Sequence, residues 1–162
     1  MEYKIGPEAR CAVVGHGSWA TAIVGLLAAG GQRVGWYVRN PEVLESLRRE
    51  GRNPRYLSDV EFDRGRIDPS DDLDAVVRDA GIVILATPSA YLREFLAPLS
   101  VPLSDKFVVS AIKGIVPGDY QTVAEYVRSR YGLSFNQIGL FSGPSHAEEV
   151  SRGKLSYLTV VC

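Results

Sequence analysis

The sequence contains little cysteine and histidine and no long apolar run. Two cysteines, Cys11 and Cys162, lie in apolar contexts at opposite ends of the 162 residues, which favours reduced, buried thiols over a disulfide framework. Two histidines and two distant cysteines do not make a metal site. No apolar run approaches the roughly 20 residues that span a bilayer, and the polar N-terminus does not resemble a signal peptide. We therefore expect a cytoplasmic protein without a membrane-inserted segment.

Net charge is also nearly absent. The formal charge is -1, and the hydrophobic share of 46% is that of an ordinary soluble globular protein. This balance gives no general argument for binding nucleic acid or an anionic membrane. No alternation of basic and aromatic residues suggests RNA, and the P-loop pattern of NTPases (G-x-x-x-x-G-K-S/T) does not occur.

Short apolar runs alternate along the chain with segments of helical period, without internal repeats. Strands are predicted over 10–14, 33–38, 82–86, 106–112 and 138–141, with a last apolar run over 155–161. Helices are predicted over 18–29, 41–50, 71–79, 89–96 and 120–130, whereas the stretch 52–67 has no clear assignment. This alternation predicts one α/β domain over residues 1–162, of Rossmann type: a doubly wound, mainly parallel sheet with helices on both faces. Ligands of such folds bind beyond the carboxyl ends of the strands.

The stretch VVGHGSWATA, residues 13–22, follows the first predicted strand and opens the first helix. Gly15, Gly17 and Ala20 fit the pattern G-x-G-x-x-A, in which each position has a physical role. The first glycine allows a tight turn, the second lets a pyrophosphate approach the backbone, and the small third residue lets the helix pack on the strand. The helix N-terminus then offers N–H groups to the phosphates. The alternative is a glycine turn without a ligand.

Arg39 stands at the end of the second predicted strand, where a carboxylate would bind the ribose 2′-hydroxyl of NAD. An arginine can instead hold the 2′-phosphate of NADP bidentately. Residues 33–55 contain six arginines and three glutamates, although Arg48 and Arg49 fit a solvated helix face. Arg39 therefore favours NADP slightly, but NAD remains open because an arginine can stack on adenine in either cofactor.

Two further stretches follow predicted strands with polar groups. Lys113 leaves the strand of VVSAIKG towards the ligand edge, although spacing alone favours a solvated lysine. In SGPSHAEEV, Ser145 and Glu148 form a capping-box pattern that predicts Ser145 as a helix N-cap, with Gly143 and Pro144 shaping the turn. That helix N-terminus would be a second anion site at the same edge.

Four stretches in this order resemble the N-terminal domain of the bacterial-type NAD(P)-dependent glycerol-3-phosphate dehydrogenases over essentially the whole chain. They are VVGHGSWATA, WYVRNPE with the following NPRYL, AIKG, and SGPSHAEEV. The resemblance implies reversible interconversion of dihydroxyacetone phosphate and sn-glycerol 3-phosphate with NAD(P)H, which serves glycerophospholipid synthesis. A different two-domain dehydrogenase, acting on a hydroxy acid, would not account for SGPSHAEE and NPRYL together.

The resemblance also implies roles for individual residues. His16 replaces the small residue usual between the two glycines, and we expect the replacement to be tolerated because its side chain can face solvent. The implied cofactor contacts are Gly15, Gly17, Ser18, Trp19, Arg39, Tyr56, Lys113 and Ala147, and the implied substrate contacts are Lys113, Gly143 and Ser145.

The chain ends inside an apolar run, LSYLTVVC, which we expect to be a buried strand. We therefore expect a fragment of a longer polypeptide. The family continues into a helical domain that supplies the catalytic lysine, so no catalytic residue is expected within residues 1–162.

The resemblance implies a homodimer for the full-length protein. We expect this chain to fold and bind cofactor weakly without turnover. The alternative from another class, a stand-alone dinucleotide sensor, would have no need of Lys113 and SGPS.

Overall fold

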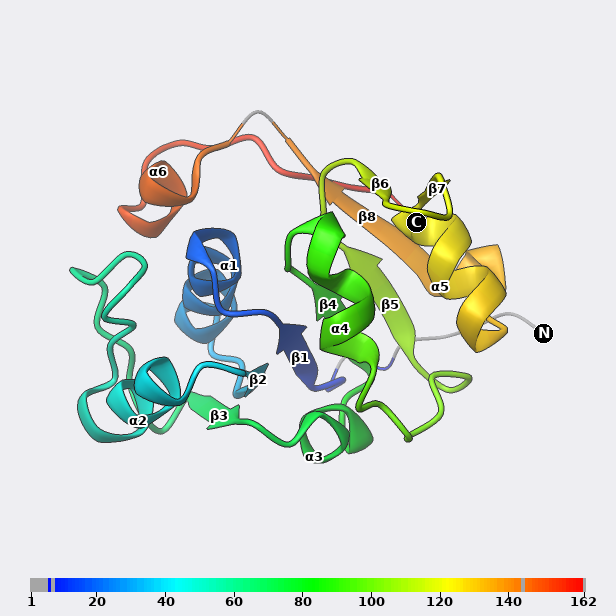
Figure 1. The fold of residues 1–162 in the computed structure, drawn as a ribbon. Coiled ribbons are helices and arrows are strands. Elements are labelled where there is room, and N and C mark those ends of the chain that lie inside the picture. The colour runs from blue at the N-terminus through cyan, green and yellow to red at the C-terminus, as the bar shows by residue number, and fades with distance from the viewer. Residues whose placement is uncertain (1–5, 7, 144, 162) are drawn as a thin grey trace.

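A computed structural model describes residues 6, 8–143 and 145–161, and within them a seven-stranded sheet forms the centre of the molecule (Figure 1). The strands are β1 (Cys11–Val14), β2 (Val34–Tyr37), β3 (Ile67–Ser70), β4 (Ile82–Leu85), β5 (Phe107–Ser110), β8 (Ile138–Ser142) and β9 (Thr159–Val161). Their order is β3-β2-β1-β4-β5-β8-β9, and every neighbouring pair is parallel except β8 with β9.

Helices cover both faces of this sheet (Figure 1). They are α1 (Ser18–Ala29), α2 (Pro41–Glu50), α3 (Leu73–Arg78), α4 (Leu92–Leu96), α5 (Val123–Tyr131) and α6 (Ala147–Ser151), with short 3-10 turns η1 (Ser89–Tyr91) and η2 (Phe135–Gln137). Val13 packs on the side of α1 and α2, whereas Ala12 and Val14 pack on the side of α3, α4 and α5. Since successive side chains of a strand point to opposite faces, both faces of β1 are apolar. The predicted Rossmann-type fold is confirmed.

The direction of winding reverses between β1 and β4. From β1 the chain builds β2 and β3 outward on one side, then returns to place β4 and β5 on the other. Ligands of open α/β sheets bind at such a reversal, beyond the carboxyl ends of the strands. The segments that follow β1 and β4 are therefore those on which a ligand site depends.

Two elements differ from the sequence expectation. Strand β3 was not expected: it begins at Ile67, the last residue of the unassigned stretch, and contains Pro69, which a sheet tolerates only at an edge such as this one. The hairpin β6 (Ile115–Val116) and β7 (Gln121–Thr122) precedes α5, so the helix predicted from residue 120 begins at Val123. Thr122 caps α5 in a capping box with Glu125, which explains the later start.

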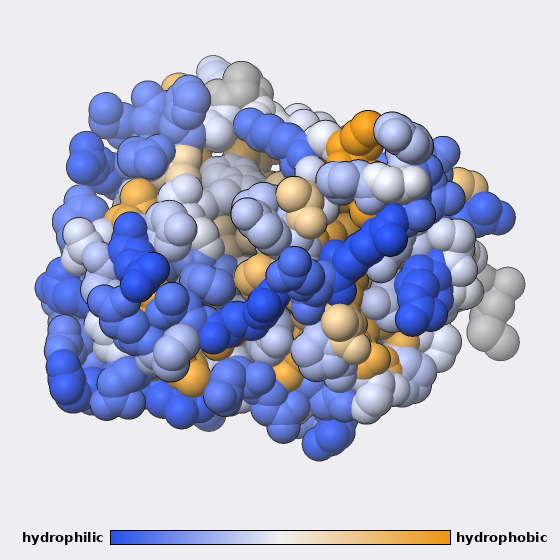
Figure 2. All heavy atoms as spheres, viewed as in Figure 1, coloured by the Kyte–Doolittle hydropathy of each residue, from blue (hydrophilic) through white to orange (hydrophobic). Residues whose placement is uncertain are grey.

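The C-terminal run also differs from expectation. Strand β9 is confined to Thr159–Val161 and is exposed along its length, so the expected buried strand is wrong. Cys11 is buried as predicted, whereas Cys162 lies outside the described residues. No helix in the described part of the chain is long and apolar enough to cross a membrane. Hydrophilic residues dominate the face shown in Figure 2, with hydrophobic residues scattered among them.

Candidate functional site

Gly15 follows β1 and is required by the chain itself. Its φ of +127° is one that side chains rarely adopt, and a Cβ there would overlap the carbonyl oxygen of Ala86 after β4. The Gly15 carbonyl oxygen accepts a 2.7 Å hydrogen bond from Trp36 Nε1, and its N–H donates to the Tyr37 carbonyl oxygen. This glycine therefore brings the loop against the ends of β2 and β4.

Gly17 is different, because nothing in the described part of the chain explains its lack of a side chain. A Cβ at Gly17 would meet no atom within 4 Å, and its φ is an ordinary -76°. Gly17 is the N-cap of α1, where no side chain caps the helix and no acidic residue stands in the first turn. The start of α1 thus presents unpaired N–H groups and open space, which is what a close-approaching anion needs.

A cleft of about 400 Å³ lies beside this helix start. Its walls come from the start of α1, the segments after β4 and β5, and the start of α6. The lining residues are Gly17, Ser18, Trp19, Ala86, Thr87, Pro88, Ala111, Ile112, Lys113, Ser145, His146, Ala147 and Glu148. The cleft has the size of a small-molecule site and brings together six residues named from the sequence: Gly17, Ser18, Trp19, Lys113, Ser145 and Ala147. Gly15, Arg39, Tyr56 and Gly143 are not among its lining residues.

Helix α6 forms the wall opposite the segment after β4. Ala147 is buried and packs with Ala22 and Val150, and Trp19 and Leu57 pack against this group. The Trp19 ring also lies 5.8 Å, centroid to centroid, from that of Phe141. Trp19, in the first turn of α1, thus contacts both α6 and β8 at the cleft.

The predicted capping role of Ser145 is wrong. Helix α6 starts two residues later, with His146 as its N-cap and without a side-chain cap. Ser145 is buried, and its Oγ donates a 3.2 Å hydrogen bond to the Tyr157 carbonyl oxygen. A Cβ at Gly143 would overlap the same carbonyl oxygen, so the segment around Tyr157 packs tightly on this turn. The Tyr157 carbonyl oxygen therefore accepts the hydrogen bond of the Ser145 hydroxyl. Pro144 lies outside the described residues.

Arg39 lies on the β2 side of the glycine loop, away from the lining of the cleft. Its guanidinium carbon is 4.7 Å from the centre of the Phe95 ring, and its NH1 is 3.5 Å from Glu94 Oε2. The side chain is 40% exposed. Arg39 therefore stands beyond β2 with part of its charge already paired.

The His16 side chain is only partly open to solvent and packs on an aromatic ring. The residue is half-buried, its ring centroid lies 5.8 Å from that of Phe95, and its Nδ1 is buried without a hydrogen-bond partner in the described structure. Burial lowers the pKa of His16, and the positive charges of Arg39 and Arg55 lower it further. The side chain packs against the Phe95 ring, which removes part of it from solvent.

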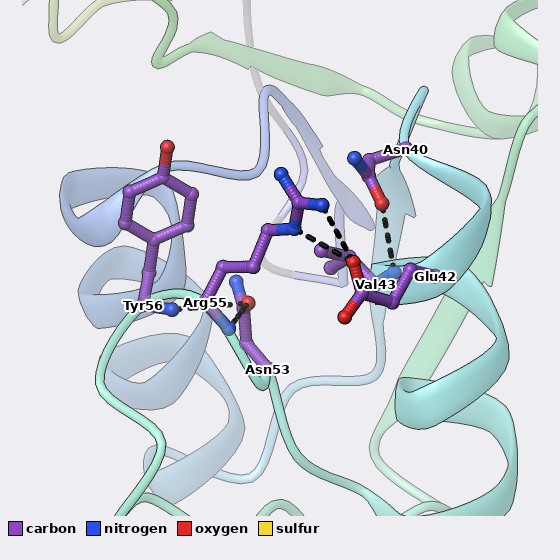
Figure 3. Close-up of polar contacts among 6 residues, drawn as sticks. All are labelled: Asn40, Glu42, Val43, Asn53, Arg55 and Tyr56. Carbon is purple, nitrogen blue, oxygen red and sulfur yellow. Dashed lines mark hydrogen bonds and ion pairs between the residues drawn. The ribbon is translucent and has the colours of Figure 1, made fainter.

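Asn53 is the residue that sequence reasoning missed. It is fully buried, and its Nδ2 donates to the His16 carbonyl oxygen at 3.0 Å and to Thr21 Oγ1 at 2.9 Å. Its Oδ1 accepts from the backbone N–H groups of Arg55 and Tyr56 (Figure 3). Asn53 thus joins the loop after α2 to the glycine loop. An asparagine before a proline indicates a turn, but no local pattern shows that its amide is buried.

Arg55 reaches from that loop across to the start of α2 (Figure 3). Its Nε and NH2 lie 2.8 and 2.6 Å from Glu42 Oε2. Asn40 caps α2 by accepting from the Val43 N–H, as Figure 3 shows. Tyr56 is 41% exposed beside this group. The described residues contain no cluster of three or more side chains that could hold a metal ion.

The fold and the cleft define a Rossmann-type α/β domain with its pocket at the winding reversal. The sequence matches, over residues 10–162, the family described as the NAD-dependent glycerol-3-phosphate dehydrogenase N-terminus. The chain belongs to this family, whose curated members are named as NAD(P)+ enzymes.

Individual relatives agree with this assignment. The chain is 41% identical over 140 residues to glycerol-3-phosphate dehydrogenase (NAD(P)+) of Ectopseudomonas mendocina, covering 86% of this chain and 40% of that protein. It is 40% identical over 144 residues to the enzyme so named from Moorella thermoacetica, covering 88% of this chain and 42% of that one. The chain thus spans less than half the length of these curated relatives.

Solved structures show the same fold. The crystal structure of glycerol-3-phosphate dehydrogenase from Coxiella burnetii superposes with a TM-score of 0.81 at 25% identity, over 94% of this chain and 46% of that one. The yeast enzyme of the same name superposes with a TM-score of 0.82 at 24% identity, also over 94% and 46%.

Proposed function

We propose that residues 1–162 form the dinucleotide-binding domain of a glycerol-3-phosphate dehydrogenase. The complete protein would interconvert dihydroxyacetone phosphate and sn-glycerol 3-phosphate with NAD(P)H, and thereby serve glycerophospholipid synthesis. Membership of the family supports the activity, and the cleft supports the site, because it gathers the glycine loop and Lys113 in one place. We further propose that the complete protein acts in the cytoplasm as a homodimer.

The observation that carries the cofactor assignment is the contrast between the two glycines. A side chain at Gly15 would collide with the chain itself, whereas one at Gly17 would enter open space at the start of an uncapped helix. A glycine that the fold does not require is explained by a ligand whose pyrophosphate must approach the backbone. The residues present therefore fit a dinucleotide.

We assign roles around this position. Gly15 shapes the loop, Gly17, Ser18 and Trp19 meet the diphosphate region, Arg39 and Tyr56 border the adenosine end, and Ala147 closes the cofactor site through α6. Bound NAD(P)H supplies the hydride. Lys113 is exposed at the cleft, where an ammonium attracts a phosphate or a developing alkoxide. Gly143 and Ser145 complete the substrate side. The general acid/base belongs to a second domain.

Titration of NADPH against the 162-residue chain, followed by nicotinamide fluorescence, tests the binding site. Gly17→Val is expected to weaken binding at least 10-fold, because its side chain fills the phosphate approach, while the melting temperature falls by only the few degrees that loss of a glycine N-cap costs. The matched control is Gly6→Val, since Gly6 also has no atom within 4 Å of a Cβ. Equal binding by both variants contradicts the proposal.

Arg39 decides the choice between NADP and NAD. Arg39→Ala is expected to weaken NADPH about 10-fold more than NADH, because only NADPH carries the 2′-phosphate. An equal loss for the two cofactors removes the 2′-phosphate role and leaves stacking on adenine.

A turnover assay tests whether the general acid/base lies outside this chain. We expect no oxidation of NADPH when this chain is mixed with dihydroxyacetone phosphate, because the general acid/base is supplied elsewhere. Measurable oxidation would contradict that division of roles. Lys113 can be acylated with a lysine-specific reagent in the presence of cofactor. If added dihydroxyacetone phosphate protects Lys113 from this reagent, the dehydrogenase is favoured, whereas a sensor predicts no protection.

A further inference from the structure

Thr87 combines burial with an unused hydroxyl. It follows β4 at the winding reversal and is only 5% exposed. Its Oγ1 is buried without a hydrogen-bond partner in the described part of the chain, and the residue lines the cleft. A buried polar group without a partner is uncommon in native proteins and calls for an explanation.

The other buried hydroxyls near the cleft have partners. Thr21 Oγ1 donates to the Gly17 carbonyl oxygen at 2.8 Å and accepts from Asn53 Nδ2. Ser110 Oγ accepts from the Ile112 N–H at 3.3 Å. Leaving a buried hydroxyl unpartnered costs folding free energy, whereas a valine of the same shape would not carry that cost. The folded chain alone therefore gives no reason for threonine at position 87.

The position of Thr87 shows which ligand group would meet it. A Cβ built at Gly15 would lie 3.3 Å from the Thr87 backbone nitrogen, so the glycine loop packs directly on this segment. Arg39 follows β2 on one side of the loop, while Thr87 follows β4 on the other, next to β5 and the segment that carries Lys113. A dinucleotide with its diphosphate on the loop and its adenosine towards β2 would extend its other half over Thr87.

We propose that the Thr87 hydroxyl binds the nicotinamide-riboside half of the dinucleotide, which makes Thr87 a positioning residue for the cofactor. This inference rests on the proposed function. Because Oγ1 is buried and Thr87 lines the cleft, the proposal includes a rotation about the Cα–Cβ bond that turns the hydroxyl towards the ligand. The ligand hydroxyl or phosphate oxygen then supplies the missing partner.

Thr87→Val and Thr87→Ser in the 162-residue chain test this role, with NADPH and adenosine 2′,5′-bisphosphate as ligands. Thr87→Val is expected to weaken NADPH about 3- to 10-fold, the effect of one hydrogen bond, and to leave the adenosine fragment unchanged. Its melting temperature should stay the same or rise. Thr87→Ser keeps the hydroxyl and should bind NADPH within about 2-fold of the parent chain.

Each other result overturns the inference in a recognisable way. Unchanged NADPH binding by Thr87→Val means that the hydroxyl does not meet the cofactor. Equal weakening of NADPH and the fragment, or a lower melting temperature with binding retained, means that the hydroxyl supports the fold. Failure of the unaltered chain to bind NADPH would overturn the proposed function itself, and this inference with it.

Discussion

Two neighbouring loops of this molecule are held by different forces. The glycine loop, residues 15–17, is fixed by backbone contacts that leave no room for a Cβ at its first residue. The loop 51–57 is held by side chains: the buried amide of Asn53 on its inner side and the Arg55–Glu42 ion pair at its surface. The two meet where Asn53 donates to the His16 carbonyl oxygen. Closeness to a ligand site therefore does not predict how much a residue stabilises the fold.

The largest loss of stability is expected for Gly15→Ala in the glycine loop. The added methyl overlaps backbone atoms that cannot rotate away, at a φ unsuited to alanine, so we expect a loss of more than about 3 kcal/mol in the free energy of unfolding. Urea unfolding measures it. The matched control is Gly17→Ala, expected to cost only about 1 kcal/mol, the loss of a glycine N-cap. Similar losses for the two glycines would remove the distinction between them.

Asn53→Ala tests the inner side of the other loop. It removes two donated and two accepted hydrogen bonds of a fully buried amide. We expect a loss of about 2–3 kcal/mol and faster amide exchange in residues 53–57. Asn53→Asp keeps the acceptor but places a carboxylate against the His16 carbonyl oxygen in a buried site, so it should not restore the stability of the parent chain. A loss below about 0.5 kcal/mol would mean that the loop is held elsewhere.

The surface of the same loop should respond much less. Arg55 and Glu42 have exposed side chains, 54% and 58%, and exposed ion pairs contribute at most about 1 kcal/mol. A double-mutant cycle with Arg55→Gln and Glu42→Gln should therefore give a coupling free energy below about 0.5 kcal/mol that shrinks with added salt. A coupling above about 2 kcal/mol would place this pair among the determinants of stability.

The smallest expected effect concerns pH. The pKa of His16 is lowered in the folded chain, by burial first and then by Arg39 and Arg55. The unfolded chain therefore binds the proton more readily, so stability should fall as pH drops from the ordinary value of 6.5 towards the lowered pKa. His16→Gln should flatten this dependence. The control is His146→Gln, since His146 is exposed; a flattening in the control alone would contradict the assignment.

The helices around the glycine loop show what local reasoning can predict. The bounds of α1 and α2 agree with the expectation, since Gly17 precedes α1, Pro41 opens α2 and Gly51 ends it in a left-handed conformation. The start of α5 was expected three residues early, because the hairpin β6–β7 has only two residues in each strand. Such a hairpin depends on pairing rather than on a periodic pattern.

The apolar strands, the two long helices and the glycine loop can be predicted from local sequence, because each depends on neighbours within a few residues. The packing of His16 on Phe95, the contact of Ser145 with Tyr157, the burial of Asn53 and the unpartnered hydroxyl of Thr87 become visible only in the folded chain. The physical reason is the same for all four: each partner, or its absence, depends on a segment distant in sequence, and burial decides what a polar group must find there.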